Sequence, residues 1–567
     1  MKKKLIALLL ILAMVLSLAA CGGGDSDEPE GYITNDPETL AAFMNTEGLP
    51  IVKEGQTASL RIFVALNANA IDPNDMLWTE YVEEKTGIDI IWEFCSESMA
   101  SEKLRLMLAG GEDMPDIIMN SINKKEVVQY MDENLFRPMD DLVDTYMPNL
   151  ATIYEKRPEY KQNSVAPDGH IYGVPYVEEM YGLGMSPGPI YVYKPWLDAL
   201  GLDVPTTLEE YRSFLEQVKA NDLNGNGESD EIPFTFQYGG YDSYEGYHWI
   251  VSCFGVNDNF AHLSVKDGKV INTATQEGFL EAVEYIYQMY ADGLIDADSY
   301  SAPMSGDPRA RVLAKINAEE PIVASVQMFD PMGEITISTE RRDDYVPLPR
   351  LTGPNGDLSG IHYNQTEMTS ATRCIITTNC KYPELAARFI DFCLAPEESV
   401  LLNWGTEDYV YVRDENGVLV WDMNEDGTPA LKEGYESINE MRWASTPVYG
   451  GLVILDEYYD TVVEYPQDAA LIIAGQRAAG SEEYLAELEY LPDLWYTEEE
   501  MDILTQNEIY VNNIVNSYVA TWLQEGGARE QWDQFLAELE AANIDAVLGA
   551  YQSAYDRYLS QNGGTQQ

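Results

Sequence analysis

The sequence predicts an α/β protein with two sheet-forming halves and a helical C-terminal region. Three features of the chain indicate this fold class. Strand-like and helix-like segments alternate between residues 60 and 119, a second alternating set begins after Tyr176, and the pattern is mostly helical from about residue 484 onward. The 567 residues allow three or four units of ~150 residues, and the apolar fraction of 45% is enough to fill large cores.

The first set has the order strand, helix, strand, helix, strand. The strand-like runs are 60–66, 88–94 and 116–119, and the amphipathic segments between them, 74–85 and 98–109, each stop near a glycine. This order predicts a doubly wound parallel sheet. A ligand crevice would then lie beyond the carboxyl ends of its strands.

The second set begins with a strand at 190–193. Thr207 and Glu210 have the spacing of a capping box at the start of an amphipathic helix. The strand-like run 374–378 and the helix-like run 383–393 follow much later. We expect these two to return to the first sheet.

The charge balance excludes one class of function. The chain has 34 basic and 96 acidic residues, a formal net charge of −62. Nucleic-acid binding requires a basic surface that releases counterions from phosphates, so a nucleic-acid binder is not predicted. The 38 tyrosines, against 14 phenylalanines, favour a wet binding cleft as well as a core, because a tyrosine ring carries a hydroxyl at its edge.

The N-terminus has the pattern of a bacterial lipoprotein leader. Lysines at 2–4 precede the apolar run 5–16 and then Leu18-Ala19-Ala20-Cys21, so residues 1–20 are expected to be a signal peptide and Cys21 a lipidated first residue. The alternative is an ordinary signal peptide with an incidental cysteine. Residues 21–57 begin with glycines and acids and are expected to be a flexible tether, with the folded part starting near Ala58.

Other motifs give weaker signals. The five cysteines after Cys21 suggest no disulfide framework; Cys374 and Cys380 could pair, but buried free thiols are expected. Residues 184–188 match Gly-x-Ser-x-Gly, yet prolines and a strand follow instead of the helix that a nucleophile elbow needs. The four histidines lack zinc-site spacing. A glycoside hydrolase that uses a pair of carboxylates remains an open alternative, because the distance between two such side chains depends on the fold.

Two acidic loops resemble cation sites. Residues 222–231 place side-chain oxygens at alternate positions in a glycine-kinked loop, but Pro233 occupies the twelfth position of an EF-hand. Spacing alone leaves a metal loop and a solvated turn equally open. Residues 422–433 match the EF-hand spacing, but the strand-like run 418–421 and Pro429 favour a β-hairpin turn there.

Several segments together resemble the large lipid-anchored solute-binding proteins that serve ABC importers of oligosaccharides in Gram-positive bacteria. They cover nearly the whole mature chain in order, at 108–118, 168–176, 194–207, 222–233 and 532–558.

The resemblance implies a two-lobed periplasmic-binding-protein-like fold of type II, with the ligand between the lobes. The expected lobes are 58–177 plus 360–440 and 178–359 plus 441–567. It also implies a monomer at the outer face of the cytoplasmic membrane that presents an oligosaccharide to ABC permease subunits. The chain has no phosphate-binding Gly-x-x-x-x-Gly-Lys-Ser/Thr motif, so ATP hydrolysis is left to those partners.

In the similar alginate-binding branch of these proteins, calcium is held by the 222–231 type of loop. The resemblance therefore implies a structural Ca²⁺ bound by Asp222, Asn224, Asn226, the carbonyl of Glu228, Asp230 and Glu231.

Sugars present apolar C–H faces and polar rims, so aromatic rings beside acids and amides are the expected binding chemistry. Two aromatic segments supply candidates, and two residues at the presumed first crossing between the lobes are added: Tyr238, Tyr241, Trp249, Trp404, Asp408, Tyr409, Tyr176 and Glu178.

Cations near these segments are few, namely Lys194, Arg373 and Arg442, so a neutral oligosaccharide is expected rather than a polyuronate. The alternatives are a surface glycoside hydrolase and a peptide-binding or adhesin lipoprotein.

Overall fold

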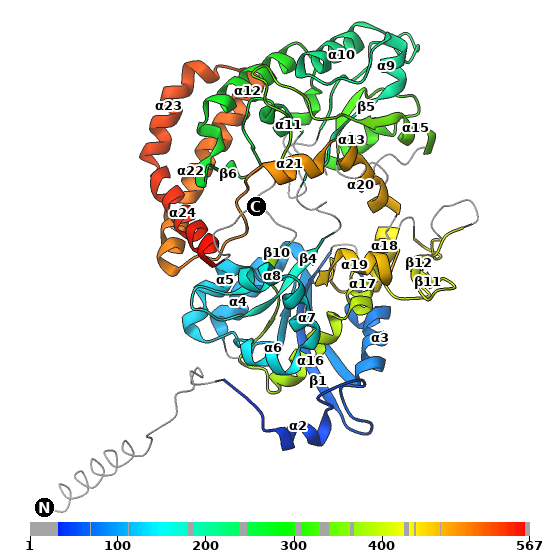
Figure 1. Ribbon diagram of the computed structural model, residues 1–567, viewed down its shortest axis with the longest axis vertical. Helices are drawn as coiled ribbons and strands as arrows, with labels where there is room; N and C mark the ends of the chain where they lie inside the picture. Colours follow the sequence, from blue (N-terminus) through cyan, green and yellow to red (C-terminus); the bar gives the residue numbers. More distant parts are fainter. Residues whose placement is uncertain are drawn as a thin grey trace, which may run out of the picture.

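The computed structural model describes residues 32–561 apart from these positions: 68–69, 112, 180–185, 237–245, 301–307, 329–338, 363–367, 425–429, 436–437, 449 and 465–466. The described residues form two lobes, one above the other (Figure 1), each with its own hydrophobic core. Among these residues, no helix is both long enough and apolar enough to cross a membrane.

The first lobe is built on a six-stranded sheet with the order β13-β4-β10-β3-β1-β2. Strands β1 (Ala58–Leu66), β2 (Ile88–Ser96) and β3 (Ile117–Met119) are parallel, with Ala58 opposite Ile88 and Ile62 opposite Ile117. Helices α3 (Leu77–Thr86) and α4 (Glu97–Gly110) connect them, and each ends at a glycine with a left-handed backbone. The parallel sheet predicted from the sequence is confirmed.

Strand β10 (Met368–Ile376) returns from the far part of the chain and pairs antiparallel with β3 and with β4 (Gly173–Glu178). The predicted return is therefore confirmed. The two backbones approach closely at Gly173, where a Cβ would lie 2.8 Å from the carbonyl oxygen of Ala371. Strand β13 (Val453–Ile454) pairs parallel with β4 and ends the sheet.

Helices cover this sheet, and a small hairpin of β11 and β12 lies beside it. The other elements of the first lobe are α2 (Pro37–Phe43), α5 (Lys124–Gln129), α6 (Asp140–Tyr146), α7 (Pro148–Lys156), α8 (Pro158–Ser164), α16 (Pro383–Cys393), α17 (Pro396–Trp404), β11 (Tyr411–Arg413), β12 (Leu419–Trp421), α18 (Ile438–Ser445) and α19 (Asp456–Thr461). Every residue of α16 is buried, which makes it the central helix of this lobe.

The second lobe surrounds a three-stranded antiparallel sheet, in which β5 (Ile190–Tyr193) lies between β8 (Ser325–Gln327) and β9 (Tyr345–Pro347), and a hairpin of β6 (Leu263–Lys266) and β7 (Lys269–Asn272). Its helices are α9 (Lys194–Leu200), α10 (Leu208–Ala220), α11 (Tyr247–Ser252), α12 (Glu277–Ala291), α13 (Pro308–Ile316), α15 (Thr339–Asp344), α20 (Gln467–Ala478), α21 (Ser481–Glu487), α22 (Glu498–Glu525), α23 (Ala528–Ala541) and α24 (Ile544–Gln561).

Local sequence signals explain where these helices begin and pack. The predicted capping box at the start of α10 is present, with the backbone N–H of Glu210 3.1 Å from Thr207 Oγ1 and the N–H of Thr207 3.2 Å from the Glu210 carboxylate. The long helix α22 packs against α12, α23 and α24, and these helices form one side of the lobe (Figure 1).

Two expected boundaries are wrong. Residues 441–463 belong to the first lobe, because β13 pairs with β4 and the buried residues Met441, Leu452 and Val463 lie in the first core. The folded part also starts before Ala58, since α2 is formed and its Leu40 is fully buried in the same core. In both places the apolar side chains join a sheet or core formed by distant segments.

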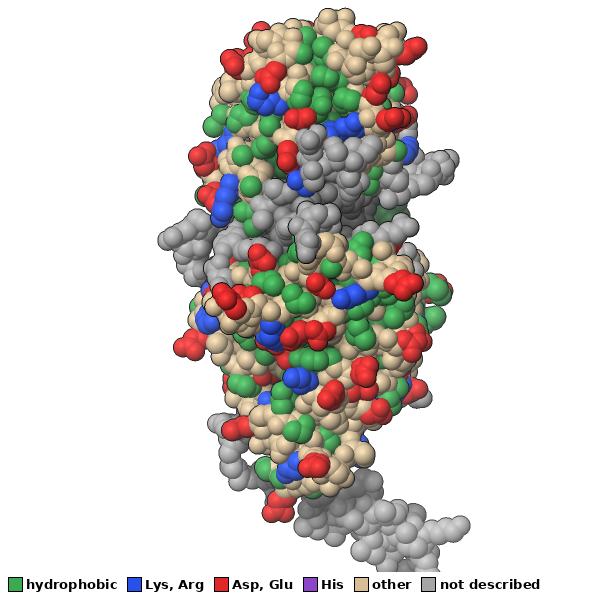
Figure 2. Space-filling view, turned by 90° about the vertical axis from the view of Figure 1, so that its right-hand side faces the viewer, with side chains coloured by type: hydrophobic (Ala, Val, Ile, Leu, Met, Phe, Trp, Pro, Cys, Tyr) green, Lys and Arg blue, Asp and Glu red, His purple; other side chains and the backbone are tan. Residues whose placement is uncertain are grey.

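The surface agrees with the acidic composition. Figure 2 shows acidic side chains scattered over the coloured parts of both lobes, with fewer basic ones among them. Many basic residues are held in ion pairs, such as Arg61 with Glu93 and Arg529 with Glu284. The described residues on this face therefore form no continuous basic area of the kind that polyanions require.

Candidate functional site

Polar and aromatic side chains gather at one end of the first sheet. Strands β1, β3, β4 and β13 run in the same direction, so their carboxyl ends share one edge. The chain leaves this edge after Glu178 and enters the second lobe at β5, so the edge faces that lobe (Figure 1). Parallel α/β sheets bind their ligands at this edge.

Glu178, the last residue of β4, is the centre of this group. Its Oε2 accepts hydrogen bonds from the hydroxyl of Tyr459, at 2.9 Å, and from the side-chain amide of Asn403, at 3.1 Å. Its Oε1 is buried and has no hydrogen-bond partner among the described residues. Burial raises the pKa of Glu178 to about 8, although Tyr459 and Arg442 act in the opposite direction. At neutral pH the carboxyl is therefore mostly protonated and can donate a hydrogen bond.

Trp404 forms one wall beside Glu178. The guanidinium of Arg442 lies 4.0 Å from the centre of its ring, and the indole N–H donates to Tyr459 at 3.3 Å. Trp421 packs edge-on against it at 5.7 Å. The ring is only 7% exposed, so Trp404 supports the site while Arg442 covers one of its faces.

Tyr176 lies two residues before Glu178 and is partly buried. The guanidinium of Arg373 lies 4.4 Å from its ring centre, donates to the carbonyl of Gly451 at 3.2 Å and also bonds Asn120. Gly450 has a positive φ of 95°, and a Cβ there would lie 2.7 Å from the Tyr176 hydroxyl. Only glycine leaves room for this tyrosine.

The sequence had singled out Tyr176, Glu178 and Trp404, and the structure brings these three together. Three further members, Asn403, Tyr459 and Asn120, were missed. Asn120 carries a faint signal, because it directly follows a predicted strand at the edge where ligands bind. Tyr459 and Asn403 carry none.

The other aromatic candidates lie elsewhere. Trp249 is buried in the second core, where its indole N–H donates to the carbonyl of Gly188 at 2.8 Å. Asp408 is exposed, and Tyr409 packs edge-on against Tyr435 in a loop after α17. Tyr238 and Tyr241 lie outside the described residues.

The 222–231 loop folds back on itself between α10 and the second lobe's core. Asp222 accepts from the N–H groups of Gly225, at 2.7 Å, and Gly227, at 2.9 Å. The amides of Asn224 and Asn226 donate to the two oxygens of Asp230, at 3.1 and 3.0 Å.

The other oxygens of the loop face its own backbone. Oδ1 of Asn224 accepts from the N–H of Asn226 at 3.1 Å, and Oδ1 of Asn226 accepts from the N–H of Glu228 at 2.7 Å. Glu231 closes the loop by accepting from the N–H of Leu223 at 2.6 Å. These residues carry oxygen donors of the kind that Ca²⁺ prefers, but to hold an ion their oxygens would have to turn away from these backbone partners. In the described part of the chain, no cluster of three or more His, Cys, Asp or Glu side chains has metal-site geometry.

The comparisons with known proteins decide the family. The sequence pattern of the bacterial extracellular solute-binding proteins matches residues 68–399. The chain belongs to this family. It is a binding protein rather than an enzyme, so the glycoside hydrolase alternative is set aside.

Three relatives of this solute-binding protein are informative. The fructooligosaccharide ABC transporter substrate-binding protein FusA of Streptococcus pneumoniae is 31% identical over 559 residues, 97% of each chain. A structure of a FusA EF-hand mutant in complex with fructo-nystose has 30% identity and a TM-score of 0.75, covering 88% of this chain and 99% of that one. Lipoprotein LipO of Bacillus subtilis is 24% identical over 333 residues, 58% of this chain and 63% of its own.

The alginate-binding protein AlgQ2, in a structure without calcium ion, shares the fold. Its identity is 18% and its TM-score 0.63, over 88% of this chain and 98% of that one.

The remaining motifs of the solute-binding protein have structural roles. Ser186 of the Gly-x-Ser-x-Gly match is buried, with its Oγ 2.6 Å from the hydroxyl of Tyr484. Cys374 and Cys380 are free and buried, as expected. The hairpin of β11 and β12 has its turn between Arg413 and Leu419, ahead of the second acidic loop. Residues 425–429 of that loop lie outside the described residues.

Proposed function

We propose that this solute-binding protein captures a neutral oligosaccharide between its two lobes and presents it to the permease of an ABC importer. The observation that carries the proposal is the group around Glu178. It sets a partly buried acid, whose Oε1 has no hydrogen-bond partner among the described residues, beside Trp404 and Tyr459 at the sheet edge facing the second lobe. A protonated carboxyl can donate to a sugar hydroxyl, and the partly exposed ring of Tyr176 suits a C–H face.

The preference for a neutral ligand rests on the arginines. Arg373 is engaged by Asn120, the carbonyl of Gly451 and the ring of Tyr176. Arg442 is engaged by Asn403 and the ring of Trp404. Guanidinium groups that already have partners add little attraction for several uronates, and the acidic surface opposes a polyanion.

Fructooligosaccharides are the first class to test, because FusA is similar along nearly the whole chain. Calorimetric titrations with kestose, nystose and an oligogalacturonate at low and high salt decide the question. We expect micromolar or tighter binding of a neutral sugar with little salt dependence. Binding of the oligouronate alone, weakening steeply with salt, would refute the proposed ligand class. A panel without any bound sugar would favour the adhesin alternative.

Calcium in the 222–231 loop is part of the proposal. The expected ligands are oxygens of Asp222, Asn224, Asn226, Asp230 and Glu231, which lie in one loop closed by its own hydrogen bonds, with the carbonyl of Glu228 as the sixth ligand. The similar protein FusA, whose structure was solved as an EF-hand mutant, supports a cation loop of this kind. The ion would tie the end of α10 to the core of the second lobe and would not contact the ligand.

Lipidation of Cys21 completes the proposal. The leader pattern and the similar lipoprotein LipO support it. A lipid anchor would hold the protein at the outer face of the membrane, within reach of its permease.

A further inference from the structure

We propose that Trp495 and Lys124 form the pivot about which the two lobes rotate, so that the lobes open and close on the opposite side, where Glu178 lies. The inference rests on the proposed function, because closing the lobes around a sugar is the motion that a pivot would guide.

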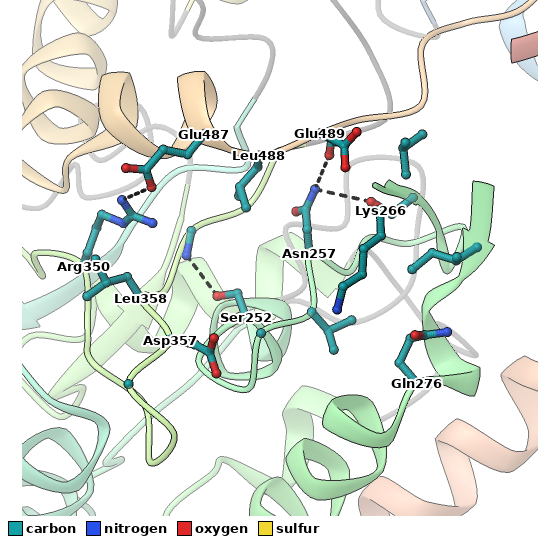
Figure 3. Close-up of a pocket in the computed structure, with 17 residues that line it drawn as sticks. Ser252, Asn257, Lys266, Gln276, Arg350, Asp357, Leu358, Glu487, Leu488 and Glu489 are labelled. Carbon is teal, nitrogen blue, oxygen red and sulfur yellow. Dashed lines mark hydrogen bonds and ion pairs between the residues drawn. The ribbon is translucent and has the colours of Figure 1, made fainter. Parts of the chain in front are cut away.

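The segment between α21 and α22 belongs to the second lobe. At the end of α21, the Glu487 carboxylate accepts from Arg350 at 2.8 Å. Two residues later, the carbonyl of Glu489 accepts from the side-chain amide of Asn257 at 3.0 Å. Figure 3 shows both bonds, at the edge of a cavity of about 450 Å³. Apolar residues farther along the segment are buried in the second core, namely Leu491, Leu494 and Tyr496.

Trp495, in the same segment, is inserted into the first lobe. Its ring is only 7% exposed and lies in the first core, and its indole N–H donates to the carbonyl of Asn163 on α8 at 2.9 Å. The carbonyl of Trp495 accepts from Arg557 on α24 at 2.8 Å, and Arg557 also pairs with Glu500 on α22 at 2.6 Å. The backbone of this residue is therefore fixed to the second lobe while its side chain is held by the first.

Lys124, the first residue of α5, holds the same segment from the first lobe. Its ammonium lies 5.4 Å from the centre of the Trp495 ring. It donates to the carbonyl of Asp493 at 2.7 Å, and the Asp493 carboxylate lies 3.1 Å away. Only 4% of the lysine side chain is exposed. A buried ammonium is costly unless it is paired and hydrogen-bonded, so these directional contacts favour one angle between α5 and the segment.

This contact has the properties of a pivot rather than of a cleft wall. Trp495, Lys124 and Asn163 are all buried, so pulling the lobes apart here would expose a large aromatic ring and break a charge-assisted hydrogen bond. Rotation about the contact keeps both. Figure 1 places it at one side of the molecule, beside α5 and α24, whereas α17, α18 and α19, which supply the partners of Glu178, lie on the other side. Rotation would therefore open the molecule at the binding group.

The test measures distances between the lobes with pairs of spin labels and pulsed electron double resonance. A pair on the helices of the pivot is Lys161→Cys on α8 with Asp502→Cys on α22. A pair on the opposite side is Glu415→Cys, in the turn between β11 and β12, with Ala478→Cys on α20. All of these positions are exposed.

Labelling is confined to these sites by Cys21→Ser and Cys95→Ser, because the other free cysteines are buried. In this background the pair at the pivot should give a narrow distance distribution that kestose leaves unchanged. The opposite pair should give a broad distribution, which kestose shifts to shorter distances and narrows.

Two variants disturb the pivot itself. Trp495→Ala should broaden the distribution of the pivot pair in the unliganded protein. Lys124→Met keeps the apolar stem beside the tryptophan but loses both contacts with Asp493, and it should have the same effect if the alanine variant folds poorly. Each should weaken kestose binding by about tenfold, because closing less ordered lobes costs more conformational entropy.

Trp92→Ala is the matched control. Trp92 is also 7% exposed in the first core, and its indole N–H donates to Thr79 at 3.1 Å, but both residues belong to the first lobe. It should leave both distributions and the Kd for kestose unchanged even if the protein is less stable.

Two results would overturn the pivot. One is a shift of the pivot pair on addition of kestose that is as large as the shift of the opposite pair. The other is an unchanged pivot distribution in the folded Trp495→Ala and Lys124→Met variants. Failure of the wild type to bind any sugar would overturn the proposed function alone, because the unliganded distributions still decide the pivot.

Discussion

Replacing Glu178 by glutamine removes a titrating proton from the buried group at the end of β4. In the folded protein burial raises the pKa of this carboxyl from 4.5 to about 8. Between these values the folded protein keeps a proton that the unfolded chain has lost. The free energy of unfolding therefore falls as the pH rises through this window, by about 1.4 kcal/mol per pH unit. From pH 5 to pH 8 the loss amounts to about 3 to 5 kcal/mol.

Glutamine keeps the size of the side chain and an oxygen that can accept from Tyr459 and Asn403, but it does not titrate. Glu178→Gln should therefore lack this contribution to the pH dependence and be more stable than the wild type at pH 8, by about 3 kcal/mol. Urea unfolding of both proteins at pH 5, 6, 7 and 8 measures the difference. Other buried acids, such as Glu398 and Asp391, titrate in both proteins and cancel in the comparison.

Glu102→Gln, an exposed position on α4, is the matched control and should keep the wild-type pH dependence. Parallel pH profiles for the wild type and Glu178→Gln would refute the reasoning. They would mean that water reaches the carboxyl and that Oε1 is not isolated as the structure has it.

Three further predictions concern other parts of the chain. A calcium chelator should lower the Tm of the wild type, and Asp222→Ala should remove this sensitivity; an unchanged Tm with chelator would reduce the loop to an ordinary turn. Mass spectrometry of membrane-derived protein should find an acylated N-terminal cysteine, and Cys21→Ser should release the protein into the medium, whereas an unmodified N-terminus would contradict the anchor. Asp258 is buried and accepts hydrogen bonds from His248 at 2.7 Å and from His262 at 3.0 Å. Burial acts to raise the pKa of Asp258, but the two histidines hold this pKa below its usual range. The stabilisation that ionised Asp258 provides is present above the ordinary aspartate pKa and is lost as the pH falls below it. Asp258→Asn should therefore lower the free energy of unfolding by about 3 kcal/mol at pH 6 and make it less dependent on pH in the acid range. An unchanged dependence in the acid range would argue against this role of Asp258.

The parallel part of the first sheet could be predicted because its signals are local. The runs that form β1, β2 and β3 alternate with amphipathic segments, and glycines mark the ends of α3 and α4. Two other signals are also local. The capping box pairs Thr207 with Glu210, three residues later, and the apolar face of α23 includes Phe535 and Leu539, four residues apart.

The lobe boundaries depended on contacts that are distant in sequence. Strand β13 has only two residues, and it becomes part of the first lobe because β4, more than 270 residues earlier, offers it a free edge. Helix α2 is similar: a short helix of this length is not stable alone, and burial of Leu40 in a core made by later segments holds it in place.

For the binding group, the acidic composition, the abundance of aromatic residues and the place of Glu178 at the crossing between the lobes could be read from the sequence. The partners that surround Glu178 follow from the packing of the folded chain. Asn403, Arg442 and Tyr459 come from α17, α18 and α19, more than 220 residues away, with no spacing that links them to β4. Trp404 and Trp249 look alike in sequence, yet one lies beside Glu178 and the other lies in the core of the second lobe. Burial and hydrogen bonding in such a site are properties of the packed chain, because each residue's surroundings are supplied by segments that the fold brings together.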